Sequence, residues 1–287
     1  MKTGIIGAGK VGFTLGKFFA RTGIQVTGYY SRHREAAEEA AEFTDTKVYD
    51  SIADIVKDSD AVFITVPDGA ITSVYNELKQ CGIKNKTICH CSGSMSADEA
   101  FPGIKKAGAS AYAIHPLFPI SSRLNSWREL ADAFFCIEGT GDHLQQWKGL
   151  LEKCGLKVQI IDSGSKGKYH AACTIACNLM CALVQKSLEL LEECGFTEET
   201  ARQALAPLMR GNLEHIIESG PVSALTGPLE RGDANTLKKH MEVLESGNDM
   251  DLYVAASAKL LSVAHRKNPS RNYSEVAAIL KEGANRK

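Results

Sequence analysis

The chain has 287 residues, of which 44% are hydrophobic and 23% are charged, as in a soluble globular protein with room for two packed domains. Lys and Arg number 33 against 34 Asp and Glu, so the net charge is -1. Such a charge gives no overall field that would attract nucleic acid or an anionic membrane. We therefore expect a small-molecule substrate as the partner, with no nucleic acid and no membrane.

The start of the chain and its cysteines favour a cytoplasmic protein. The first apolar stretch is short and rich in glycine, unlike the apolar core of a signal peptide. Nine cysteines are an odd number, so we expect reduced thiols rather than a disulfide framework. Cys89, His90 and Cys91 alternate between the faces of a strand and lack a second ligand pair, so we expect no metal site.

A GxGxxG loop lies between the first expected strand and the first expected helix. In such a loop Gly7 permits a tight bend, Gly9 lets the backbone approach phosphates, and Gly12 lets the helix pack closely on the strand. The free N–H groups at the start of the helix then face an anion. A glycine-rich surface turn is the alternative. The context favours a dinucleotide pyrophosphate, with these loop residues as its ligands: Gly7, Ala8, Gly9, Lys10, Val11 and Gly12.

The first half of the chain alternates between strand and helix patterns. Strands are expected at residues 4–6, 25–30, 47–49, 61–66, 87–91, 110–114, 133–138 and 157–161. Helices are expected between them, at residues 34–43, 52–57, 71–80, 97–106 and 144–154. This alternation predicts an α/β fold with a doubly wound parallel sheet, which binds its ligand at the carboxyl ends of the strands.

The end of the second strand indicates which dinucleotide is bound. NAD enzymes place an acid there, whereas this chain has Ser31, Arg32 and Arg34. Two arginines in the first turn of a helix oppose its dipole unless an anion lies between them. The 2′-phosphate of NADP is such an anion, so the sequence favours NADP over NAD; a solvated surface turn is the alternative.

Three later strands end at the same edge of the predicted sheet. The fourth ends at Val66, Pro67 and Asp68, near the expected nicotinamide, and there Asp68 fits a helix N-cap better than a catalytic acid. Ser92 and Gly93 follow the fifth strand, where hydroxyl and N–H groups can hold a substrate carboxylate. A plain turn would have the same sequence. His115 follows the sixth strand and either lines the cleft or bonds to backbone.

After residue 161 the pattern is helical only, at residues 166–193, 198–218, 234–244, 251–265 and 273–282. We therefore predict a dinucleotide-binding domain at 1–163 and an all-helical substrate and dimerisation domain at 164–287. Residues 169–185 contain no Asp, Glu, Lys or Arg. Such a helix must be buried, either in the centre of the helical domain or in a dimer whose helical domains interlock. A membrane span is the competing interpretation, but polar residues interrupt it.

Two groups in the second half are candidates for chemistry. Lys166, His170, Thr174 and Asn178 recur every four residues, which places them on one face of a helix. Lys166 can donate a proton as hydride arrives, and His170 can position the substrate or adjust the proton affinity of the lysine. The alternatives are a solvated lysine at a helix start and a core histidine whose hydrogen bonds are all made within the protein. Arg231 lies in a turn-rich segment and can bind an anionic substrate or a neighbouring subunit.

An ordered set of motifs carries a family resemblance: the GxGxxG loop and residues 66–68, 90–93, 115–117, 166–170 and 226–233. The set resembles a bacterial family that joins a Rossmann-like domain to a helical C-terminal domain of unknown function. That family is similar to the 6-phosphogluconate dehydrogenase-like superfamily, with β-hydroxyacid dehydrogenases, pyrroline-5-carboxylate reductases and deazaflavin-dependent NADP oxidoreductases as relatives. The resemblance implies NADP binding and a homodimer formed by the helical domain, and it supplies no substrate.

The β-hydroxyacid dehydrogenase pattern can be carried over residue by residue. Ser92 and Gly93 match its substrate-holding turn, and Lys166 matches its catalytic lysine. Four residues later those relatives carry asparagine, whereas this chain has His170, preceded by Tyr169. This departure puts the relatives' substrate classes in doubt.

These inferences predict an NADP-dependent oxidoreductase. It would move hydride between the nicotinamide and a small, anionic hydroxy-acid, carbonyl or imine compound, with Lys166 and His170 as catalytic residues. Two alternatives stay open from the sequence. One is a dinucleotide-binding sensor or regulatory protein without chemistry, and the other is a dimerisation scaffold with an empty nucleotide fold.

Overall fold

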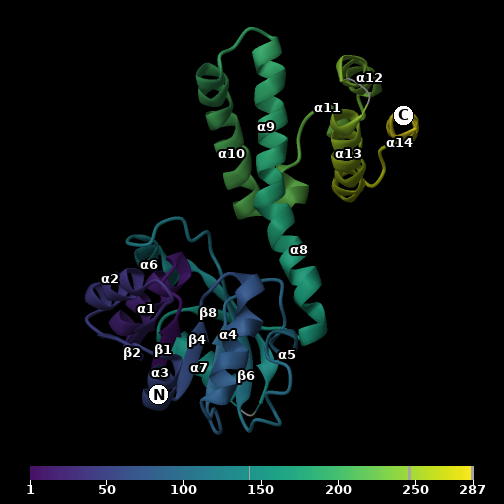
Figure 1. The fold of residues 1–287 in the computed structure, drawn as a ribbon. Helices are drawn as coiled ribbons and strands as arrows, with labels where there is room; N and C mark the ends of the chain where they lie inside the picture. The colour runs from purple at the N-terminus through teal and green to yellow at the C-terminus, as the bar shows by residue number, and fades with distance from the viewer. Residues whose placement is uncertain (142, 245–246, 286–287) are drawn as a thin grey trace. The chain divides into compact units, whose positions relative to one another are not determined.

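The computed structural model describes residues 1–141, 143–244 and 247–285, which form two compact units, Met1–Asn178 and Leu179–Lys287 (Figure 1). The predicted domain boundary after residue 163 lies in the 3-10 turn η2 (Ser163–Ser165), which precedes helix α8 (Lys166–Ala176). By its contacts, however, α8 belongs to the first unit. The assignment of functions to domains 1–163 and 164–287 stays a prediction.

An eight-stranded sheet forms the centre of the first unit, in the order β3-β2-β1-β4-β5-β6-β7-β8. Every strand expected from the sequence is present: β1 (Lys2–Ile6), β2 (Gln25–Tyr30), β3 (Lys47–Val48), β4 (Ala61–Ile64), β5 (Thr87–His90), β6 (Ser110–Leu117), β7 (Phe134–Thr140) and β8 (Lys157–Ile160). The expected all-parallel arrangement is wrong at one place, because β7 runs antiparallel to β6. The sheet is therefore mixed.

The direction of β7 follows from the connection that precedes it. A parallel neighbour needs a crossover that carries the chain back along the sheet, usually through a helix. Between β6 and β7 the chain forms only α6 (Ser126–Glu129) and the 3-10 turn η1 (Leu130–Asp132), both short. Alternation of side chains along a strand is the same in either direction, so the sequence pattern could not reveal the reversal.

Helices pack on both faces of the sheet: α1 (Lys10–Thr22), α2 (Arg34–Thr44), α3 (Ile52–Asp58), α4 (Asp68–Gln80), α5 (Ala97–Ala100) and α7 (Leu144–Lys153). The helix expected at 97–106 is shorter than predicted. It ends at Ala100, because the next residue, Phe101, has a φ of -127° and a ψ of 63°, which are not helical. Phe101 precedes Pro102, and proline disfavours helical backbone in the residue before it.

Strand β4 explains why the sheet is covered on both sides. All of its residues are buried, and they alternate between two hydrophobic clusters. Val62 and Ile64 belong to one cluster with residues of α3, α4 and α5, whereas Ala61 and Phe63 belong to the other, with residues of α1 and α7. A strand buried on both faces is typical of parallel α/β sheets, and it fixes the strand ends that carry the site.

The second unit is all-helical, with α9 (Asn178–Glu193) from its second residue onward, α10 (Glu198–Ala224), α11 (Pro228–Arg231), α12 (Ala234–Val243), α13 (Asn248–Lys267) and α14 (Ser274–Ala284). Its hydrophobic core is built mainly from α11 to α14, around Leu237, Met241, Met250, Val276 and Leu280. Asp233 caps α12 by accepting a hydrogen bond from the Thr236 N–H at 3.1 Å.

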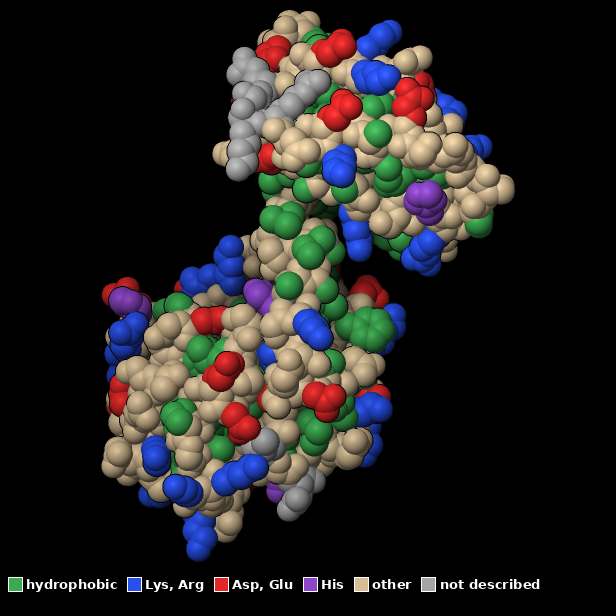
Figure 2. Space-filling view, turned by 90° about the vertical axis from the view of Figure 1, so that its right-hand side faces the viewer, with side chains coloured by type: hydrophobic (Ala, Val, Ile, Leu, Met, Phe, Trp, Pro, Cys, Tyr) green, Lys and Arg blue, Asp and Glu red, His purple; other side chains and the backbone are tan. Residues whose placement is uncertain are grey.

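The expectation that the apolar helix is buried in its own helical domain is wrong. The predicted single helix is divided by Cys177 into α8 and α9, and α9 has no buried residue. Cys177 and Cys181, on this apolar stretch, are exposed. Figure 2 shows uncovered hydrophobic side chains in green on the helical unit. By length and composition alone, the stretch Ser163–Glu193 could also cross a membrane.

Candidate functional site

The GxGxxG loop has the geometry that its sequence predicts. Gly7 has a φ of +108°, which favours glycine, and a Cβ on Gly12 would lie 2.1 Å from the Gly7 carbonyl oxygen. A Cβ on Gly9 would meet nothing within 4 Å, so this part of the loop is open to a ligand. Thr65, at the end of β4, donates its hydroxyl to the Gly7 oxygen at 2.7 Å. The loop is thus a rigid cradle that a phosphate can approach.

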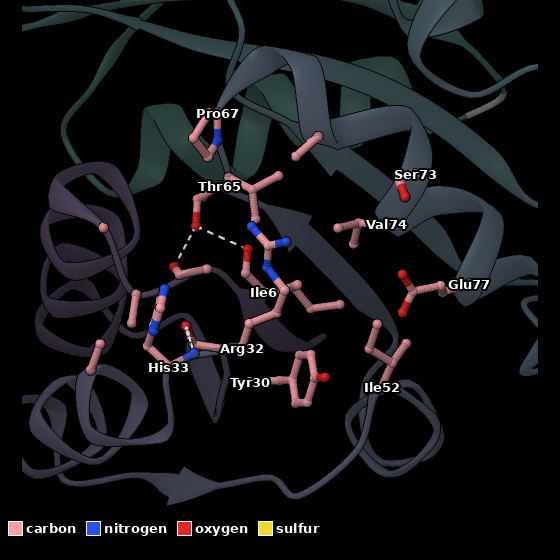
Figure 3. A pocket seen from close by; sticks show the side chains of 17 residues that line it. Ile6, Tyr30, Arg32, His33, Ile52, Thr65, Pro67, Ser73, Val74 and Glu77 are labelled. Atoms are coloured by element: carbon pink, nitrogen blue, oxygen red, sulfur yellow. Dashed lines mark hydrogen bonds between the residues drawn. The ribbon is translucent and has the colours of Figure 1, made fainter.

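A pocket of about 280 Å³ lies beside this loop at the carboxyl ends of β1, β2 and β4 (Figure 3). The side chain of Arg32 extends into it. Most of the predicted cofactor ligands line it: Gly7, Ala8, Gly9, Ser31, Arg32, Val66 and Pro67. Lys10, Val11, Gly12, Arg34 and Asp68 do not. Of the two arginines expected to bind the ribose phosphate of a dinucleotide, only Arg32 therefore lines the pocket.

Arg34 has different partners from those expected. Its guanidinium donates to Glu38 at 2.8 Å and also pairs with Asp50. Hydrogen bonds and charge from these carboxylates raise the pKa of Arg34. The side chain is exposed, so these pairs contribute little to stability. They nevertheless hold Arg34 outside the pocket, where the sequence had predicted that both arginines bind the 2′-phosphate. Of these two arginines, Arg32 alone lines the pocket.

Every polar group of Ser92 takes part in a hydrogen bond within the protein. Its N–H donates to Nδ1 of the buried His90 at 3.1 Å, and its carbonyl oxygen accepts from Nζ of Lys166 at 2.9 Å. Its hydroxyl donates to the Asp68 carboxylate at 2.6 Å and accepts from the N–H groups of Ser94 and Met95. The predicted substrate hydroxyl is thus already committed to the turn. Asp68 is not the N-cap of α4, because Pro67 occupies that position.

Lys166 is buried at the start of α8, with a side chain only 2% exposed. Burial lowers its pKa, while nearby groups such as Cys136 and Glu138 oppose that shift. A lysine with a lowered pKa exchanges protons more readily near neutral pH. Its ammonium also lies 5.5 Å from the centre of the Tyr169 ring.

Two histidine side chains contact Gly93. A Cβ on Gly93 would lie 2.7 Å from Nδ1 of His170 and 3.0 Å from Nε2 of His115, so both imidazoles contact the glycine directly. His115 Nδ1 and the Tyr169 hydroxyl are 2.7 Å apart. Burial first, and then the charge of Lys166, lower the pKa of His115 to about 4, so this imidazole is neutral at pH 7.

The structure therefore brings together most of the predicted substrate and catalytic residues: Ser92, Gly93, His115, Lys166 and His170. Asn178 is exposed and lines a groove that His115 and His170 also line. The predicted four-residue stripe is interrupted before it, because α8 ends at Ala176. Arg231 is exposed at the end of α11 in the second unit.

Sequence reasoning missed three residues around these sites. Thr65 fixes the phosphate loop, and Tyr169 bonds to His115. Arg123 donates to the Ala8 carbonyl oxygen at 3.4 Å from a loop far along the chain. No sequence pattern pointed to Arg123, because it reaches Ala8 only where the folded β6–β7 connection passes close to α1. Among the described residues there is no cluster of three His, Cys, Asp or Glu side chains that could hold a metal.

Comparisons with known proteins agree with this architecture. Residues 1–116 match the sequence model of a Rossmann-like domain, and residues 133–260 match that of a domain of unknown function, DUF2520. The chain therefore joins the two domains that the resemblance implied. No curated protein matches it.

Several solved structures share the fold over nearly the whole chain. A Thermotoga maritima protein is 28% identical with a TM-score of 0.73, covering 92% of this chain and 99% of its own. A proposed NADP oxidoreductase from Bacteroides fragilis is 20% identical with a TM-score of 0.69, covering 91% and 98%. Pyrroline carboxylate reductase from Plasmodium falciparum, solved with NADP bound, is 13% identical with a TM-score of 0.57, covering 99% and 97%. At the lower identities the likeness concerns the fold alone.

Proposed function

We propose that the protein is an NADP-dependent oxidoreductase that acts on a small, anionic hydroxy-acid, carbonyl or imine compound. The observation that carries this proposal is the open glycine cradle with Arg32 in the adjoining pocket. Backbone N–H groups at the start of α1 suit the pyrophosphate, and the Arg32 guanidinium suits the 2′-phosphate. The NADP-bound relative with the same fold supports this assignment.

The second part of the proposal concerns the reaction. NADPH, when bound, would supply the hydride that reduces the substrate double bond, and the oxygen or nitrogen of that bond would then need a proton from the protein. Lys166, with its lowered pKa, is the proposed acid/base, and His170 the group that positions substrate. Both lie near the Ser92–Gly93 turn. Asn178 is proposed as a further substrate contact, because it lines the same groove as His115 and His170.

We further propose that the protein is a cytoplasmic homodimer. The exposed apolar side chains of α9 and α10 support a dimer in which the helical units of two subunits cover each other. Such a dimer would bury the apolar helix that the sequence predicts to be buried. Arg231 would then face either the substrate or the neighbouring subunit.

The cofactor assignment is tested by titrating NADPH and NADH into the wild type and two arginine variants, with cofactor fluorescence as the signal. Arg32→Ala should weaken NADPH binding by roughly 10- to 100-fold, the range for losing a hydrogen bond to a charged group, and leave NADH binding nearly unchanged. Arg34→Ala is the matched control, because its guanidinium is paired elsewhere. Equal losses for both cofactors would contradict the assignment of Arg32.

A second function, a dinucleotide-binding sensor without chemistry, is favoured by one observation. The Lys166 ammonium is buried and bonded to the Ser92 backbone, as a purely structural lysine would be. The two functions are separated by following NADPH absorbance with small oxo acids, hydroxy acids and cyclic imines. Turnover of any of them that Lys166→Ala removes supports the enzyme, whereas NADPH binding without turnover across the set supports the sensor.

A further inference from the structure

The groove beside Gly93 contains a hydrogen-bonded pair whose role is not explained by cofactor binding. His115 and Tyr169 come from β6 and α8, and their polar atoms meet at 2.7 Å. The rings are perpendicular, with an interplanar angle of 84°. Both residues line the groove together with His170, Cys173 and apolar side chains such as Ala172 and Ala176.

The pair determines which nitrogen of His115 carries the proton. Burial raises the pKa of the Tyr169 hydroxyl, so this hydroxyl keeps its proton and can donate it to Nδ1. The thiol of Cys136 is also near this hydroxyl, and burial raises its pKa, so it remains a weak donor to the phenolic oxygen. A neutral imidazole that accepts at Nδ1 carries its proton on Nε2.

Nε2 of His115 then serves as a donor at the Gly93 turn. No hydrogen bond to a described residue engages this nitrogen, and it is not among the buried atoms without a partner. The neighbouring Nδ1 of His170 is such a buried atom. Because both nitrogens contact the same glycine, they are close enough for one oxygen atom to reach both. A buried ring nitrogen without a partner costs about 1–3 kcal/mol, which a bound oxygen would recover.

We propose that His115 donates from Nε2 to the carbonyl oxygen of a small oxo acid, and that Tyr169 acts as the positioning residue that fixes this tautomer. The inference rests on the proposed oxidoreductase function and narrows its substrate class. A carbonyl oxygen accepts hydrogen bonds and gains negative charge as hydride arrives, which a fixed donor stabilises. A protonated imine would instead present an N–H donor and positive charge to His115 and to the nearby Lys166 ammonium, an arrangement that these groups disfavour.

The tautomer is tested by ¹⁵N spectra of the full-length, histidine-labelled protein with NADP⁺ added. His115→Gln and His170→Gln assign two of the eight histidines. At pH 7 we expect His115 to be neutral with its proton on Nε2, and Tyr169→Phe to move it toward the other tautomer. Tyr253→Phe is the matched control, since Tyr253 bonds in the same way to His240 at 2.9 Å in the second unit. A proton on Nδ1 of His115 in the wild type would overturn the proposal.

Binding is tested in the same spectra with glyoxylate and pyruvate as probes. The His115 and His170 signals should shift in a saturable way, and Tyr169→Phe should weaken the apparent affinity by about tenfold, the effect of losing one hydrogen bond. Gly93→Ala should abolish the shifts, because its methyl group overlaps both imidazole nitrogens. Gly167→Ala, on the exposed side of α8 with open space around it, should not.

The outcomes separate this inference from the function on which it rests. If NADPH binds and neither oxo acid shifts the His115 signal, the inference is wrong and the cofactor assignment stands. If the oxo acids shift both signals and neither NADPH nor NADH binds, the oxygen site stands and the oxidoreductase function is wrong. A stronger response to 1-pyrroline-2-carboxylate, a cyclic imine, than to either oxo acid would also overturn the inference.

Discussion

At the scale of single residues, the candidate site is arranged around the Ser92–Gly93 turn, and the Ser92 hydroxyl is part of that turn rather than free to bind a substrate. His90, Asp68 and Lys166 each bond to a different polar group of Ser92. Residue type and position made Ser92, His115 and Lys166 candidates for substrate binding or catalysis. They could not predict that the hydroxyl and the carbonyl group of Ser92 are already occupied, because Asp68 and Lys166 come from two distant segments of the chain.

Replacing Lys166 tests its proposed role most directly. Lys166→Ala should leave NADPH affinity within about twofold and reduce turnover by about 10²- to 10⁴-fold, the usual contribution of a general acid. It should also lower the melting temperature, because the Ser92 carbonyl loses its partner at a cost of about 1–3 kcal/mol. Lys168→Ala, on the exposed side of the same helix, is the control for both measurements. Full turnover in Lys166→Ala would contradict the assignment.

The buried His90 predicts how stability depends on pH. Burial, together with the charge of Lys166, lowers its pKa from 6.5 to about 4 in the folded protein. Between these values the unfolded chain binds the extra proton, so stability falls as the pH drops from 6.5 to 4, by about 3 kcal/mol for this group.

Urea unfolding at pH 7 and pH 4 measures this loss. His90→Asn keeps an acceptor for the Ser92 N–H and removes the titrating group, so its stability should fall by about 3 kcal/mol less than that of the wild type over this range. His33→Asn, at an exposed position, is the control and should behave like the wild type. Identical pH dependence in His90→Asn and the wild type would show that the folded protein binds a proton at His90.

At the scale of elements, the β1–α1 unit is the part that local sequence describes best. Its glycines act within a dozen residues of each other, so spacing alone predicts the bend and the close helix contact. Helix α8 is the opposite case. Its four-residue stripe indicated a polar face, but the stripe is interrupted where α8 ends at Ala176, and the contact of His170 with Gly93 depends on a segment distant in sequence.

Two glycine variants separate the roles within the phosphate loop. Gly9→Ala should fold with unchanged stability, since a Cβ there meets nothing within 4 Å, yet weaken NADPH by about tenfold or more because its methyl group occupies the phosphate approach. Gly12→Ala should instead lose about 1–3 kcal/mol of stability through its clash with the Gly7 oxygen.

Chemical unfolding and NADPH titration together give both quantities. Gly149→Ala on α7 has equally open surroundings and no place in the pocket, so it should leave NADPH affinity unchanged and, as a helix-interior glycine, raise stability by about 0.5–1 kcal/mol. Normal NADPH affinity in Gly9→Ala would mean that the cradle is not the pyrophosphate site.

At the scale of the whole molecule, the two halves differ in how completely they bury their apolar residues. The clusters of the first unit enclose both faces of its sheet. The helical unit leaves large apolar side chains exposed on α10, including Leu208 at 69% and Ile217 at 74%. Exposed apolar surface on this scale is typical of a subunit interface.

The proposed homodimer predicts a concentration-dependent mass. The wild type should sediment as a dimer at micromolar concentration, and the double variant Leu208→Glu, Ile217→Glu should weaken the dimer by about a hundredfold or more, since each buried apolar side chain contributes about 1.5–3 kcal/mol. Leu124→Glu, an exposed leucine in the first unit, is the matched control. A monomeric wild type with intact helices would contradict the proposal.

The sequence by itself determined the alternation of strands and helices, the phosphate loop and the change to an all-helical half, because each depends on periodicity or on glycines close together in the chain. Only the tertiary structure decided that β7 reverses, that Arg32 and not Arg34 enters the pocket, and that His115 and His170 both contact Gly93 while Tyr169 bonds to His115. These features depend on strand direction and on contacts between distant segments. Local patterns of hydrophobic and polar residues carry no information on either.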